Sequence, residues 1–126
     1  MGGSITKRKT RRVKYYPVDV VRKVLSNELL LAIVQVLLSE SLPLHCGEVV
    51  RRLEGIFGRP FTTGHVSALL RKLERWGVAR PYRSPYNGHL LWTAAETKTA
   101  NLLAEALRKR EAEKLMNTLR QAGIEV

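Results

Sequence analysis

The sequence predicts one mostly α-helical domain of the α+β class, with a small β-hairpin and a long C-terminal helix. Three observations lead to this fold class. Apolar residues recur every three or four positions over several separate stretches, which is the spacing of helices that bury one face. Asn87-Gly88 lies between two short β-prone runs, a pattern typical of a hairpin. Residues 95–121 consist mainly of strong helix formers.

Length and composition indicate a globular intracellular protein. The 126 residues suit one domain, and 44% of them are hydrophobic, which is enough for a packed core. The longest apolar run, Leu29 to Leu38, contains Gln35 and is too short to cross a bilayer, so we expect no membrane span. We find no secretory signal pattern. The single cysteine, Cys46, excludes an intramolecular disulfide and fits a reducing compartment. We therefore expect a cytoplasmic protein, nucleoid-associated if it binds DNA.

The positive charge is large and unevenly distributed. There are 22 lysines and arginines against 11 acidic residues, and the excess is concentrated in the first 24 residues. Such a surplus favours a polyanionic partner, because bound cations release the counterions condensed on phosphates. Residues 1–16 are predicted to be a disordered basic arm that binds phosphates or, alternatively, only a solubilising tail. Its candidate contact residues are Lys7, Arg8, Lys9, Arg11, Arg12 and Lys14.

The domain itself is expected over residues 17–94, and it opens with two helices. Pro17 suits the first position of a helix that ends near Leu25. Its apolar residues at helical spacing are Val18, Val21, Val24 and Leu25. Ser26 is the predicted N-cap of a second helix that runs through Ser39. This helix is apolar over most of its circumference and should form the centre of the core, through Leu29, Leu30, Ile33, Val34, Leu37 and Leu38.

Two further helices and a hairpin follow. A short extended segment is expected at residues 42–44, and a helix over residues 47–57 that Gly58-Arg59-Pro60 ends. The next helix spans residues 62–76, with Thr62 or Thr63 as its cap and Gly77 in the left-handed conformation beyond its end. Its inward face consists of Val66, Leu69, Leu70, Leu73 and Trp76. Hairpin strands are predicted at residues 78–82 and 89–93, with Trp92 in the core beneath them.

Two consecutive helices joined by Gly58-Arg59-Pro60-Phe61-Thr62, with a hairpin directly after them, suggest a helix-turn-helix followed by a wing. Residues 66–78, VSALLRKLERWGV, resemble the third helix of winged helix-turn-helix transcription regulators of the MarR, PadR and ArsR kind. The similarity covers roughly residues 26–94. It implies a winged helix-turn-helix fold that binds double-stranded DNA, with helix 62–76 in the major groove.

The residue types on helix 62–76 agree with that implication. Its first half has small and polar side chains that permit close approach to base edges, and its second half has cations suited to phosphates. The candidate contacts are Thr62, Thr63, His65, Ser67, Ala68, Arg71, Lys72 and Arg75. The alternatives are that the threonines only cap the helix, that His65 is an ordinary exposed histidine, and that the cations form a solvated face paired with Glu74. In the wing, the candidates are Arg80, Arg83, Tyr86 and Asn87; the alternative is an ordinary surface hairpin.

Residues 95–126 are predicted to form a C-terminal helix that joins two copies of the chain. Its apolar stripe changes phase after the charged interval 108–111, so one part should pack on its own domain and the other on a partner. MarR- and PadR-like proteins are similar in dimerising through terminal helices; the alternative is a monomer. The candidate dimerisation residues are Leu103, Leu107, Leu115, Met116 and Leu119.

Other classes of function find less support. The sequence has no phosphate-binding glycine loop, metal-binding histidine motif or nucleophile elbow, so we expect no catalytic residue, metal, cofactor or small-molecule ligand. RNA binding lacks the aromatic signature of single-strand modules. Two alternatives stay open beside a site-specific regulator: a low-specificity DNA-coating, chromatin or plasmid-partition protein, and an acylated membrane adaptor, because residues 1–6, MGGSIT, match the myristoylation pattern.

Overall fold

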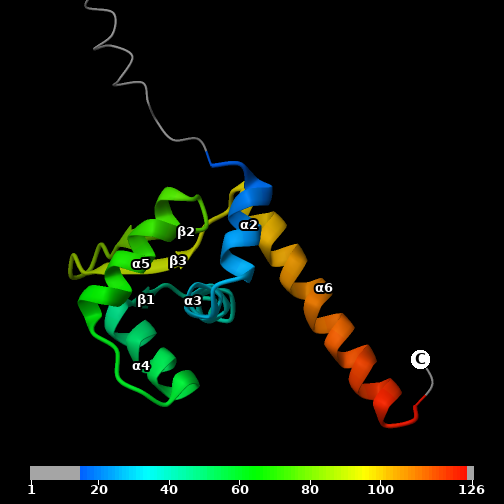
Figure 1. The fold of residues 1–126 in the computed structure, drawn as a ribbon. Coiled ribbons are helices and arrows are strands. Elements are labelled where there is room, and N and C mark those ends of the chain that lie inside the picture. Colours follow the sequence, from blue (N-terminus) through cyan, green and yellow to red (C-terminus); the bar gives the residue numbers. More distant parts are fainter. Residues whose placement is uncertain (1–14, 125–126) are drawn as a thin grey trace, which may run out of the picture.

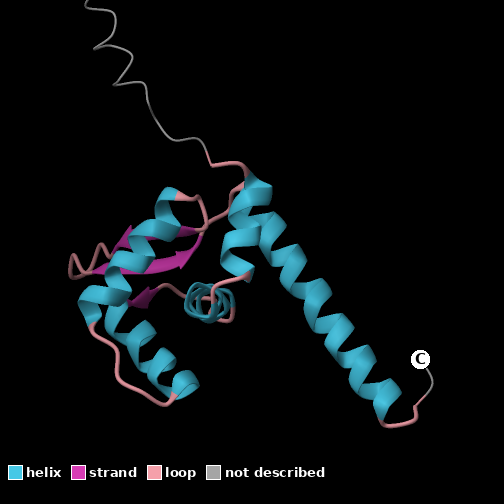
Figure 2. Cartoon of the chain, viewed as in Figure 1, coloured by secondary structure: helices cyan, strands magenta, loops and turns pink. Residues whose placement is uncertain are grey.

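The computed structural model describes residues 15–124, which form five helices and one three-stranded antiparallel sheet (Figures 1 and 2). The sheet order is β1-β3-β2, so the C-terminal hairpin strand lies in the middle. The predicted basic residues 7–14 lie outside the described part of the chain. The elements are α2 (Pro17–Leu25), α3 (Glu28–Leu38), β1 (Leu44–His45), α4 (Cys46–Phe57), α5 (Thr63–Arg75), β2 (Ala79–Arg83), β3 (Leu90–Ala94) and α6 (Lys98–Gln121).

The first two helices differ from the sequence prediction in their details. The N-cap of α3 is Asn27, whose Oδ1 accepts a hydrogen bond from the Leu30 N–H at 3.0 Å. Ser26, the predicted cap, instead closes α2, because its N–H donates to the Arg22 carbonyl. In α2 the buried residues are Val20 and Val24, whereas the predicted Val18 is 60% exposed. The face of α2 that is buried is therefore set by packing against α6 and α3 rather than by the spacing of its valines alone.

The core is centred on α3, as the sequence predicts. Ile33 and Val34 are almost completely buried, and the helix contacts α2, α4 and β3. Trp92 on β3 is 1% exposed and belongs to the same cluster, which confirms its predicted place under the hairpin. Leu38, by contrast, is 42% exposed at the end of α3. The core therefore joins the helices to the sheet and fixes the hairpin to the body of the protein.

Capping and left-handed glycines define both ends of α5. Thr62 is the N-cap, as one of the two predicted alternatives, and its Oγ1 accepts a hydrogen bond from the His65 N–H at 3.1 Å. At the other end Gly77 has φ +80°, as predicted, and Val78 N–H donates to the Leu73 carbonyl at 2.8 Å. This bond and the one from Gly77 N–H to Glu74 form a Schellman motif, which ends the helix and turns the chain into β2.

The hairpin is where the sequence places it, with both strands shifted by one residue toward the C-terminus. Ala79 faces Ala94 at one end of the ladder, and Arg83 faces Leu90 at the other. The other side of β3 pairs with β1, the short extended segment predicted after α3. The hairpin is thus not a free-standing ribbon, because its second strand is held between two neighbours.

Helix α6 has a proximal part that is packed on the domain and a distal part that is not. Thr97 caps the helix by accepting from the Ala100 N–H, and its hydroxyl donates to the Gly77 carbonyl. Leu103 and Leu107 are buried in the common core, so the prediction that they bind a partner is wrong. Beyond Leu107 no described residue is buried, and Figure 1 shows this part of α6 extending away from the other elements.

Candidate nucleic-acid interface

The first turns of α5 present small and polar side chains to solvent. Thr62, Thr63, His65 and Ala68 are exposed, and Ser67 is half-buried. No acidic residue lies in the first turn of this helix, so no negative side chain there offsets the partial positive charge at the start of the helix. On the opposite face Val66, Leu70 and Leu73 are completely buried. The helix is therefore fixed to the core while its other side offers hydrogen-bonding groups and little bulk.

The three cations of α5 have different surroundings. Arg71 donates to the Glu74 carboxylate at 2.9 Å, and its guanidinium lies 5.1 Å from the Trp92 ring centroid. Lys72 is half-buried, with its ammonium 5.5 Å from the Trp76 ring centroid. Arg75 is exposed and makes no ion pair with the described residues. The charge of Arg71 is thus partly offset within the helix, whereas those of Lys72 and Arg75 are not.

The end of the hairpin is held by its own hydrogen bonds. Arg83 Nη1 donates to the Gly88 carbonyl at 2.7 Å, and Asn87 Oδ1 accepts from the His89 N–H at 3.0 Å. These contacts leave the Asn87 amide NH₂ and most guanidinium N–H groups of Arg83 free to donate elsewhere. Tyr86 is 94% exposed at the tip. The tip thus presents one cation, Arg83, and a phenol, whereas the exposed Arg80 lies near the other end of the hairpin, opposite Thr93.

Arg59 is a candidate that the sequence reasoning did not select. It lies in the turn between α4 and α5, is exposed, and holds its guanidinium 4.3 Å from the Phe61 ring centroid. The ring of Phe57 is also nearby, at 6.0 Å. In the sequence, the arginine stands between Phe57 and Phe61, and this pattern could have indicated the contact because guanidinium groups stack on aromatic faces. This cation is held next to the start of α5.

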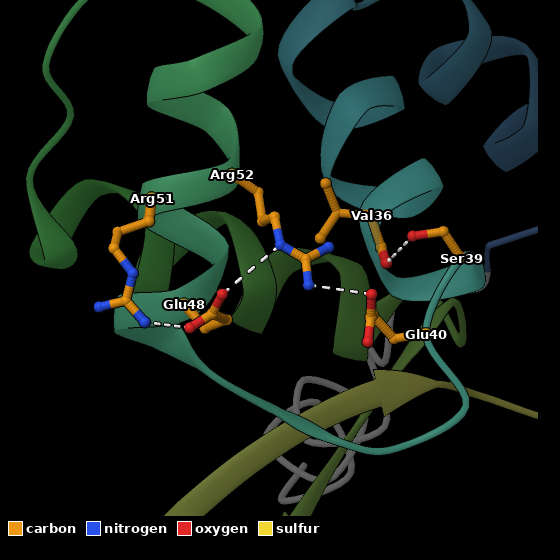
Figure 3. A network of polar contacts seen from close by, with 6 residues as sticks. All are labelled: Val36, Ser39, Glu40, Glu48, Arg51 and Arg52. Atoms are coloured by element: carbon orange, nitrogen blue, oxygen red, sulfur yellow. Dashed lines mark hydrogen bonds and ion pairs between the residues drawn. The ribbon is translucent and has the colours of Figure 1, made fainter.

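The arginines of α4 are occupied by a separate network of ion pairs (Figure 3). Arg52 donates to Glu40 at 2.9 Å and lies 3.5 Å from Glu48, while Arg51 pairs with Glu48 on its other side. The hydrogen bond with Glu40 raises the pKa of the Arg52 guanidinium above its ordinary value. The network connects α4 to the end of the α3 segment, where Ser39 Oγ donates to the Val36 carbonyl. Its charges are balanced locally and add little to a phosphate-binding surface.

Figure 1 places α5 and the tip of the hairpin on the side of the molecule opposite distal α6. The structure therefore brings the predicted residues of α5 and the hairpin to one region and separates Leu115, Met116 and Leu119 from it.

Within residues 15–124 no group of three or more histidines, cysteines or acidic residues lies close enough together to hold a metal. Cys46 is half-buried, and this burial raises the pKa of its thiol. None of the helices in the described part is long and apolar enough to cross a membrane.

A comparison with protein-family models finds no match to this chain, and a comparison with curated proteins finds no similar sequence.

Proposed function

We propose that this protein binds double-stranded DNA as a winged helix-turn-helix protein, with α5 in the major groove and the β2–β3 hairpin as the wing. The order of its elements supports this assignment, because two helices joined by a tight turn precede an antiparallel hairpin whose second strand pairs with a short strand from before the two helices. The observation with the most weight is the division of α5 into a buried apolar face and an exposed face that is polar at one end and cationic at the other.

The exposed face suits a duplex chemically. Side chains as small as Ala68 and Ser67 allow the helix axis to approach base edges, where Thr63 and His65 offer donors and acceptors. Arg75 and Lys72 follow further along the helix, and lysines and arginines are the residues that contact phosphates beside a groove. Arg59 precedes the helix, and Arg80 and Arg83 follow it. Phosphate contacts would thus surround the residues that read bases.

We further propose that two copies associate through distal α6. Leu115 is 60% exposed and Met116 is 39% exposed, on a part of the helix that no described element covers. A helical segment of roughly 14 residues is only marginally stable in water without tertiary packing, so a partner surface would stabilise it. The groove beside the helix, whose lining includes Leu38 and Ala104, supplies apolar surface next to the exposed stripe. A two-fold dimer would present two copies of α5 and would favour a transcription regulator that occupies a palindromic site.

The charge distribution favours a second candidate, a protein that coats DNA with little sequence preference. The excess of cations over acidic residues extends well beyond α5, and a sequence-independent electrostatic term would suffice for such a role. The polar first half of α5 favours the site-specific regulator instead. The two candidates share the fold and the interface and differ only in how strongly base edges contribute.

Duplex binding measured by fluorescence anisotropy tests the proposal. The full chain is titrated onto labelled random DNA and onto sites selected from a random pool, at salt concentrations from about 50 to 200 mM. A steep salt dependence with selected sites bound at least about a thousandfold more tightly identifies a site-specific regulator. A steep dependence without preference identifies the coating protein. Absence of salt-dependent duplex binding refutes both.

A further inference from the structure

The environment of Trp76 differs from that of an ordinary core tryptophan. Trp76 follows α5 directly and is 9% exposed. Three side chains lie close to its ring, one from the residues before α2, one from α2 and one from α5. The Tyr15 ring lies 5.9 Å from the Trp76 ring at an interplanar angle of 54°. The ammonium groups of Lys23, from α2, and Lys72, from α5, lie 5.6 Å and 5.5 Å from its centroid. We call these four residues the Trp76 cluster.

Two cations lie near this ring, and no carboxylate in the described part of the chain forms an ion pair with either of them. The nearest acidic residues along the two helices have other partners, because Glu74 pairs with Arg71 and Asp19 lies 3.8 Å from Arg22. Neither lysine makes an ion pair with the described residues. The face of an indole attracts a cation by about 0.5–1 kcal/mol at an exposed site, which holds each ammonium in place but leaves its charge unneutralised. An anion that reaches both ammonium groups would be bound by preplaced charges.

The position of the cluster connects the proposed DNA surface to the basic N-terminal sequence. Lys72 belongs to the exposed cationic end of α5, and Lys23 continues the positive surface onto α2. Tyr15, the first described residue, packs on the same ring, and Lys14 precedes it in the sequence. Six of the eight residues from Lys7 to Lys14 are cations. In the sequence, the first residue of the cluster therefore comes directly after the most basic stretch of the chain.

We infer that the Trp76 cluster is a phosphate-binding site that extends the duplex contact beyond α5. In this arrangement Lys72 and Lys23 bind phosphates of the DNA backbone next to the stretch contacted by α5. The contacts are independent of sequence and contribute affinity and salt dependence rather than base preference. This inference rests on the proposed function, because it places the duplex against α5. Its new content is the assignment of Lys23, on α2, to the duplex contact.

The test compares Lys23→Gln with Lys109→Gln in the full-length protein. Both variants lose one exposed lysine and change net charge equally, but Lys109 lies on α6 beside the groove between α2 and α6, away from the Trp76 ring. Lys23→Gln should reduce the salt slope of duplex binding by about 0.9, so the fall in affinity between 50 and 200 mM salt becomes roughly threefold smaller. Lys109→Gln should leave the slope unchanged. Lys23→Arg should restore it.

Three further outcomes decide against the inference. An unchanged salt slope in Lys23→Gln, with the wild type binding duplex normally, refutes the site while leaving the proposed function intact. A fall in melting temperature without a change in slope shows that Lys23 only stabilises the fold. Lys23-dependent binding to vesicles with about 30% anionic lipid, without any effect on duplex binding, assigns the cluster to a membrane instead. Absence of salt-dependent duplex binding by the wild type refutes the proposed function itself.

Hydroxyl-radical footprinting provides an independent readout on a selected site. If the contact extends as inferred, the wild type protects backbone positions on one flank of the α5 contact that Lys23→Gln leaves cleavable. Protection of that flank by Lys23→Gln equal to that of the wild type would contradict the inference.

Discussion

Replacing Gly77 by alanine tests whether a left-handed turn sets the hairpin relative to α5. Gly77 has φ +80°, and a methyl group added there would lie 3.6 Å from Thr97 Oγ1, an ordinary contact distance. Steric overlap therefore contributes little, and the cost comes from the backbone conformation. An L-residue in the left-handed region costs roughly 1–2 kcal/mol, so Gly77→Ala should lower the free energy of unfolding by about that amount.

The matched control is Gly55→Ala, the same chemical change inside α4. Gly55 is exposed, and apart from its two chain neighbours and the backbone of its own helix no described atom lies within 4 Å of the position that its Cβ would occupy. Alanine is favoured over glycine in a helix by about 0.5–1 kcal/mol, so this variant should be more stable than the wild type. If the free energy of unfolding falls in Gly77→Ala and rises in Gly55→Ala, the difference reports the backbone conformation at Gly77 rather than an effect of the added methyl group. At this chain length 1 kcal/mol corresponds to roughly 4 °C in Tm.

Urea denaturation followed by circular dichroism measures both variants against the wild type. A Gly77→Ala variant as stable as the wild type would refute the reasoning, because it would mean that the turn after α5 relaxes without cost. A functional readout accompanies the stability measurement. The Gly77 carbonyl accepts a hydrogen bond from Thr97, so a shift of the turn should displace both the hairpin and the start of α6. Duplex affinity should then fall under conditions where the variant is fully folded.

Three other predictions concern the cap, the cations and the distal helix. Thr62→Ala removes the acceptor for the His65 N–H and should cost about 1 kcal/mol in urea denaturation, whereas Thr62→Ser should cost less. Arg75→Gln should lower the salt slope of duplex binding by about one, and Arg71→Gln should lower it less, because Glu74 already offsets that charge; equal effects would contradict this difference. Leu115→Lys should convert a dimer to a monomer in light scattering without lowering the Tm of the monomeric domain, because its side chain is 60% exposed and outside the core.

Features encoded by neighbouring residues were predictable from the sequence. The Thr62 cap, the left-handed Gly77 and the existence of the hairpin each depend on residues within one turn, where local propensity dominates. The choice of Asn27 over Ser26 as a cap was not predictable in this way. Ser26 and Asn27 are both good capping residues. Which of them caps α3 depends on where α2 ends, because the Ser26 N–H donates to the Arg22 carbonyl at the end of α2.

Features that depend on distant parts of the chain could not be derived from spacing. The burial of Val20 rather than Val18 is decided by α6, which lies some eighty positions later in the sequence. Leu103 and Leu107 of α6 are likewise buried in the core. Seen in the sequence alone, these apolar residues could equally bind a partner. In the candidate site, the sequence identifies which residues are cationic but not which cations have partners. The base- and phosphate-contacting roles themselves remain predictions.

The pairing of the cations supports the proposal that the face of α5 would meet a polyanion. Arg51 and Arg52 on α4 each face a glutamate, and these pairs satisfy their charge within the protein. Arg59, Arg75 and Arg80, in the turn before α5, at its end and on the hairpin, make no ion pair with any described residue. Arg71 is the exception on α5, because it pairs with Glu74. An exposed surface ion pair contributes at most about 1 kcal/mol, so stability alone gives little reason for the difference between α4 and these three arginines. A duplex does give one, because each unpaired cation that meets a phosphate releases a counterion, and a cation already paired must first lose its glutamate.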